Sequence, residues 1–170
     1  MPTTRASLPR PRSQPWLTAV VLTLAAAGAA PAQTTTWQAT TTSNWGDPAN
    51  WTNGVPAPGL VAVFSTAGAT QFATNNDVTG LTIDGLTVNG LAPQPFTIGG
   101  NAFTIGTAAG IDMSAAAQNL TVNPNVTLGV TQPWAVAAGR TLTANGTIDG
   151  AGGLTVPGAG LVQVTNAAST

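Results

Sequence analysis

The sequence predicts an all-β protein wound as a parallel β-helix, or β-solenoid, of roughly four to five coils. Short triplets in which threonine stands between two apolar residues recur along the chain, and this period-2 alternation is typical of strands with one buried face. Related triplets return after about 20–24 residues, which lies within the range of one solenoid turn. Asn-Gly and Asp-Gly pairs stand between them, where corners are needed. An antiparallel β-sandwich uses the same strand lengths and turns, and it is the alternative fold.

Residues 1–32 are predicted to be a secretory signal peptide. Three of the chain's four basic residues lie within the first 12 positions. An apolar stretch of about 15 residues follows, and Ala30-Pro31-Ala32 provides a small-residue cleavage site. A retained membrane anchor is the alternative, although a span needs roughly 20 apolar residues. We therefore expect export with cleavage before Gln33, a secreted or cell-surface location, and no stable membrane insertion after cleavage.

Residues 33–64 are predicted to form a Trp-rich N-terminal cap that contains Trp37, Trp45 and Trp51. The first coil of a solenoid exposes an apolar cross-section and unpaired strand edges. Large aromatic side chains bury roughly 150–250 Å² each and can plug that section. In the alternative interpretation, the same three tryptophans form a platform that stacks on sugar rings. Exposure distinguishes the two, because cap tryptophans are buried and platform tryptophans face solvent.

Residues 65–170 are predicted to be the β-helical repeat region. Outer residues of each triplet are expected to point inward, with threonine pointing outward. One irregular stretch, Thr107 to Ala117, is expected to be a loop that projects from the stack. The triplets between Gln71 and Leu128 are Leu81-Thr82-Ile83, Leu86-Thr87-Val88, Phe96-Thr97-Ile98, Phe103-Thr104-Ile105, Leu120-Thr121-Val122 and Val126-Thr127-Leu128.

The stretch from Gly146 to Leu161 carries the most specific motif, GTIDGAGGLTVPGAGL, in which apolar residues alternate with glycine turns. This stretch resembles the autotransporter-associated β-strand repeat, and residues 33–64 resemble the Trp-rich segment often found before such repeats. The resemblance implies a right-handed β-helix and a secreted or surface-displayed bacterial passenger. It also raises the hypothesis that the chain is a fragment of a longer autotransporter-like protein. It implies no reaction.

The composition argues against several classes of function. Beyond the predicted signal peptide the only basic residue is Arg140, whereas phosphate neutralisation is the main source of nucleic-acid affinity. The chain has no cysteine and no histidine, and all five acidic residues are aspartates. Disulfides are therefore excluded. We expect no catalysis, because a base and paired carboxylates are lacking, and no metal or cofactor.

These observations predict a non-catalytic structural or adhesive passenger that makes weak polar contacts through a repeated threonine and asparagine surface. The expected partners are surface polysaccharide or other passenger coils, and no nucleic acid. A carbohydrate-binding module that uses Trp37, Trp45 and Trp51 is the alternative. Nothing in the sequence covers the strands expected near Leu154 and Leu161, so we also expect end-to-end self-association or fraying from Gly153 onward.

Overall fold

The computed structural model describes Met1, residues 32–65 and residues 68–166. The chain separates into two units, Met1–Ala30 and Pro31–Thr170, and the fold belongs to the second. Apart from its first and last residues, the predicted signal peptide lies outside the described residues.

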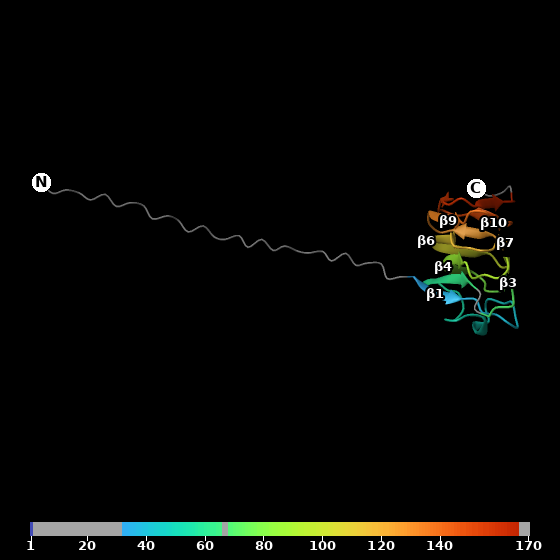
Figure 1. The fold of residues 1–170 in the computed structure, drawn as a ribbon. Helices are drawn as coiled ribbons and strands as arrows, with labels where there is room; N and C mark the ends of the chain where they lie inside the picture. The colour runs from blue at the N-terminus through green and yellow to red at the C-terminus, as the bar shows by residue number, and fades with distance from the viewer. Residues whose placement is uncertain (2–31, 66–67, 167–170) are drawn as a thin grey trace. The chain divides into compact units, whose positions relative to one another are not determined.

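The described chain folds almost entirely into short β-strands, and every pairing between named strands is parallel. One sheet has the order β1-β2-β4-β6-β8-β11, with β9 and β12 continuing from β6, and the other has the order β13-β10-β7-β5-β3 (Figure 1). The elements are β1 (Gln33–Thr36), the 3-10 helix η1 (Pro48–Asn50), β2 (Leu60–Phe64), β3 (Ala73–Asn76), β4 (Leu81–Val88), β5 (Phe96–Gly100), β6 (Phe103–Met113), β7 (Leu120–Val122), β8 (Val126–Leu128), β9 (Gln132–Val136), β10 (Thr141–Ala144), β11 (Ile148–Asp149), β12 (Leu154–Thr155) and β13 (Leu161–Val164). The predicted parallel β-helix is confirmed, and the sandwich alternative is wrong.

The later turns have three sides, as the pairing of the long strand β6 shows. The first half of β6 pairs with β8, and its second half pairs with β9. Strand β4 pairs with β6 along both of its halves, with a register shift between Ile83 and Gly85, and its second half alone also pairs with β2. One turn therefore consists of the two halves of β6 followed by β7. The next two turns are β8-β9-β10 and β11-β12-β13.

The solenoid makes about six turns rather than the four to five expected. The difference arises in residues 33–64, which were predicted to be a cap outside the stack. Strand β1 pairs in parallel with β2, placing Gln33 opposite Leu60 and Thr36 opposite Val63. The Trp-rich segment is therefore itself the first turn of the stack and the start of the second.

The stretch from Thr107 to Ala117 does not project as a loop, so that prediction is wrong. Strand β6 continues to Met113, and both Ile111 and Met113 are completely buried. The alternation is hard to see in the sequence because small residues precede it and Gly110 makes the bend with a positive φ of 63°. The second half of β6 then pairs with β9, as the interior of a sheet does.

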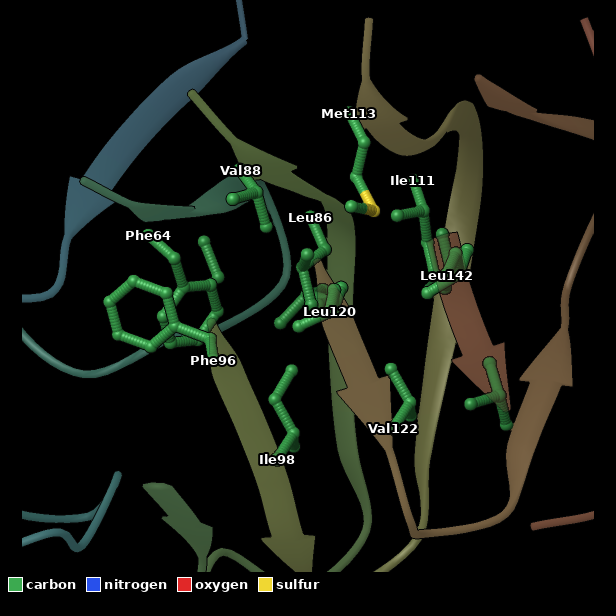
Figure 2. Close-up of a cluster of buried hydrophobic side chains, with 14 of the residues drawn as sticks. Phe64, Leu86, Val88, Phe96, Ile98, Ile111, Met113, Leu120, Val122 and Leu142 are labelled. Atoms are coloured by element: carbon green, nitrogen blue, oxygen red, sulfur yellow. The ribbon is translucent and has the colours of Figure 1, made fainter. Parts of the chain in front are cut away.

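A single apolar column runs inside the turns. Figure 2 shows side chains from successive strands of both sheets pointing into this common core. Phe64 of β2 and Phe96 of β5 meet with ring centroids 5.1 Å apart. Leu86, Leu120 and Leu142 continue the column through later turns, and each is no more than 1% exposed. Because every turn packs on the one before it, stability depends on the contact between neighbouring turns.

Two neighbouring side chains of β9, Gln132 and Trp134, carry buried polar atoms that have no hydrogen-bond partner among the described residues: both amide atoms of Gln132 and Nε1 of Trp134. Gln132 on β9 is 1% exposed, and neither its Nε2 nor its Oε1 forms a hydrogen bond there. A buried polar group left unsatisfied costs about 1–3 kcal/mol.

We expect Gln132→Met, which keeps the length of the side chain, to raise the free energy of unfolding in urea by about 1–3 kcal/mol. The exposed Gln94 supplies the control, since Gln94→Met should change stability by less than about 0.5 kcal/mol. A loss of stability in Gln132→Met would contradict the prediction.

Candidate functional site

The three predicted site residues, Trp37, Trp45 and Trp51, form one buried aromatic cluster. Their exposed fractions are 0%, 0% and 2%. Trp51 meets Trp37 and Trp45 edge to face, with centroid distances of 4.9 Å and 5.6 Å. Each indole N–H also has an acceptor: Trp37 Nε1 donates to the carbonyl of Gln71, Trp45 Nε1 to Thr74 Oγ1, and Trp51 Nε1 to the carbonyl of Trp45.

A local turn brings the cluster together. Asp47 caps the 3-10 helix η1, with Oδ1 accepting from the backbone N–H of Ala49 at 3.0 Å, and Pro48 occupies the first helical position. This cap reverses the chain between Trp45 and Trp51, which are six residues apart. The predicted burial of the tryptophans is confirmed. The carbohydrate platform required solvent-facing rings at Trp37, Trp45 and Trp51, and burial of all three overturns it.

The outer surface carries two rows of threonines in register. Thr82, Thr104 and Thr127 lie opposite one another on β4, β6 and β8. Thr97, Thr121 and Thr143 do the same on β5, β7 and β10. All six side chains are partly exposed. Because parallel strands lie about 4.7–4.9 Å apart, each row presents a hydroxyl and a methyl group at that interval.

Asparagines at the corners connect one turn to the next. Asn145 Nδ2 donates to Asn123 Oδ1 at 2.8 Å, 22 residues earlier, and Thr165 Oγ1 donates to Asn145 Oδ1 at 2.9 Å. The Oδ1 atom of Asn125 accepts the backbone N–H of Thr147, again across 22 residues. The asparagines therefore do more than favour turns: they hydrogen-bond successive turns together.

The five aspartates occupy structural positions rather than a shared centre. Asp77 Oδ1 accepts the backbone N–H of Gly46 at 2.7 Å, and Asp84 Oδ1 accepts that of Gly59 at 2.9 Å. The others likewise accept hydrogen bonds: Asp47 from Ala49, Asp112 from Ser114 and Asp149 from Thr127. Within the part of the chain that the structure describes, no three metal-binding side chains of the His, Cys, Asp or Glu type come together.

A hollow of about 550 Å³ lies beside β1, and its lining residues carry no ionisable side chain. It is lined by Ala32, Gln33, Thr34, Asn53 and Leu60. No helix among the described residues is long and apolar enough to cross a membrane.

The fold and its surface define a parallel β-solenoid with two outer threonine rows, of which the row on β4, β6 and β8 is followed in register by the exposed Asp149. Comparison with protein-family models, with curated proteins and with solved structures returned no match.

Proposed function

We propose that this chain is a non-catalytic structural or adhesive β-solenoid that is exported and acts outside the cell or at its surface. The observation that carries the proposal is the register of the outer threonine row on β5, β7 and β10. Three consecutive turns present Thr97, Thr121 and Thr143 directly opposite one another, with partly exposed side chains. Identical polar groups at a fixed repeat favour a repeating partner.

A neutral polysaccharide is the partner that this surface fits best. Its hydroxyl groups can exchange hydrogen bonds with a row of threonine hydroxyls, and many weak contacts along one chain add up when they form together. Residues flanking the row are also neutral and polar: Asn119 lies just before β7, Thr141 is the first residue of β10, and Asn123 and Asn145 follow the two strands. Such binding should be nearly independent of salt, because screening acts on charges.

The N-terminal residues support export. Residues 1–32 have the basic, apolar and small-residue parts of a secretory signal peptide. Strand β1 begins at Gln33, so cleavage before this residue would leave the first strand of the solenoid intact. The resemblance to autotransporter-associated repeats agrees with a surface role, either for this chain alone or for a longer protein that contains it.

To test the proposal, the full chain with its own N-terminus is expressed in a bacterium. Adsorption of the exported protein to insoluble cellulose and chitin is then measured. We expect recovery from the exported fraction and retention that changes little between low and high salt. Substituting valine at Thr97, Thr121 and Thr143 keeps the shape of the row and removes its hydroxyls, so retention should fall several-fold.

The matched control substitutes valine at Thr82, Thr104 and Thr127, the row on the other sheet, and it should retain most of the adsorption. Far-UV circular dichroism checks that both variants fold. Protein that stays in the cytoplasm would contradict the export part of the proposal. Failure to adsorb, or equal adsorption by both triple variants and the parent, would contradict the adhesive part.

A further inference from the structure

A ladder of asparagine side chains crosses the solenoid turns where the strands of the β13-β10-β7-β5-β3 sheet end. Asn75 Nδ2 donates to Asn44 Oδ1 at 3.0 Å, and Asn145 Nδ2 donates to Asn123 Oδ1 at 2.8 Å. In both pairs the amide nitrogen faces the preceding turn, and the amide oxygen accepts from the following one. The ladder therefore has one direction along the whole stack.

A glycine interrupts this ladder between its two pairs. Gly99 of β5 lies opposite Asn75 of β3. On the other side of β5, Ile98 pairs with Val122 of β7, so Asn123 follows Gly99 in the register. Asn75 and Asn123 are thus separated by two strand intervals, or about 9–10 Å. The turn between them contributes no side chain to the ladder.

Each side of this interruption offers a polar atom that forms no hydrogen bond among the described residues. Asn75 Oδ1 reaches toward the turn of Gly99, because a Cβ atom added at Gly100 would lie only 2.7 Å from it. Asn123 accepts from Asn145 through Oδ1, which leaves its Nδ2 on the side of Gly99. Both asparagines reach solvent. We call this position, Gly99 between an acceptor and a donor, the amide gap.

We propose that the amide gap binds the acetamido group of an N-acetylated amino sugar. The inference rests on the proposed polysaccharide function and names the class of sugar. A secondary amide is planar and trans, so its N–H and C=O point in opposite directions. The N–H can donate to Asn75 Oδ1 while the carbonyl accepts from Asn123 Nδ2. The ligand then completes the ladder in place of the missing asparagine.

The surroundings of the amide gap suit a sugar that carries such a group. A Cβ atom at Gly99 would meet nothing closer than the carbonyl oxygen of Thr74, at 3.6 Å, so the space above the glycine is open. Thr97 lies two residues earlier on β5, on the same face, and is in register with Thr121. A sugar is favoured over a peptide because its hydroxyl groups match these threonine hydroxyls.

Titration of the full chain with short soluble sugars tests the proposal. We expect the trisaccharide of N-acetylglucosamine to bind several-fold more tightly than cellotriose, which has a hydroxyl in place of each acetamido group. Asn123→Asp keeps the acceptor for Asn145 but replaces the donor that faces the amide gap, so affinity should fall to that of cellotriose. Asn125→Asp is the matched control, since its Oδ1 likewise accepts from Thr147, and it should bind like the parent.

Gly99→Asn supplies the missing amide from the protein itself. Gly99 has no positive φ and its Cβ position is open, so β5 can carry an asparagine there. The new side chain should bond to Asn75 and Asn123, raise the urea midpoint of unfolding and lower the affinity for the acetylated trisaccharide several-fold. Gly139→Asn adds the same side chain before β10, where nothing lies within 4 Å, and should leave the affinity unchanged.

Equal affinity for the acetylated trisaccharide and cellotriose would overturn the proposal. So would parent-like affinity in folded Asn123→Asp or Gly99→Asn, or tighter binding of N-acetyl-trialanine than of the sugar, which would indicate a peptide partner. Adhesion through the threonine row is judged separately, from retention on the insoluble polymers. Binding of the acetylated trisaccharide without any such retention would contradict the adhesive function and leave the amide gap supported.

Discussion

Gly110→Ala is expected to lower the free energy of unfolding by about 2–5 kcal/mol, as the sum of two costs. Gly110 has a φ of 63°, a conformation that costs an L-residue about 1–2 kcal/mol. In addition, a Cβ atom would collide with the backbone carbonyl of Pro133 on the next turn. That backbone is held by the pairing of Ile111 with Trp134 and cannot move away without breaking the ladder between β6 and β9. Overpacking of this kind typically costs a further 1–3 kcal/mol or so.

Alanine substitutions at two other glycines measure the cost of the positive φ and the cost of the collision separately. Gly139 has a similar φ of 71°, yet nothing lies within 4 Å of the Cβ position, so Gly139→Ala should cost only about 1–2 kcal/mol. Gly146 lacks a positive φ but its Cβ would meet the backbone of Pro124, so Gly146→Ala isolates the collision. Urea denaturation followed by circular dichroism measures all three. Equal losses in Gly110→Ala and Gly139→Ala would mean that neighbouring turns are not as close as the structure places them.

The strands with clear triplets were predictable from the sequence because their pattern is local. All six triplets between residues 81 and 128 lie in strands, two of them in β4 and the others in β5, β6, β7 and β8. In each, the outer residues are buried and the threonine is partly exposed, as alternation requires. A repeat of 22 residues or so then places like triplets side by side.

The parts that could not be predicted depend on contacts between turns. The second half of β6 gave no signal because alanine and glycine fill its bend, and only its pairing with β9 makes it a strand. Pro133 lies within β9 opposite Thr155, where it gives up one ladder donor, although proline is usually confined to edge strands and bulges. The role of the corner asparagines was also hidden, since turn preference alone explains asparagine there.

The sequence predicted that the tryptophans are buried, but it did not predict how far along the solenoid their contacts reach. The sequence predicted burial of Trp45 beneath the first coil. It gave no sign that the ring also reaches Phe103 of β6, at a centroid distance of 6.0 Å, while its N–H bonds to Thr74. The cluster therefore joins the first turn to strands that lie much later in the chain.

Trp45→Ala is accordingly expected to cost about 3–5 kcal/mol of unfolding free energy, the usual range for removing a fully buried large aromatic side chain. The ring contacts Trp51, Phe64 and Phe103 at centroid distances of 5.6, 5.7 and 6.0 Å, and these neighbours belong to different turns, so they cannot close together to fill the space. Trp45→Phe keeps an aromatic ring but gives up the hydrogen bond to Thr74, so it should lose less.

The loss should also be directional, because a solenoid is held by contacts between neighbouring turns and can open from one end. In Trp45→Ala, amide hydrogen exchange should accelerate in β1 and β2 more than in β8 and β10. Leu91→Ala, which truncates a side chain that is 65% exposed, is the control and should change stability by less than about 0.5 kcal/mol. If Trp45→Ala instead lowered protection equally in all four strands, the solenoid would unfold as one unit. A loss within 1 kcal/mol or so of the parent would show that the first turn is held without its aromatic plug.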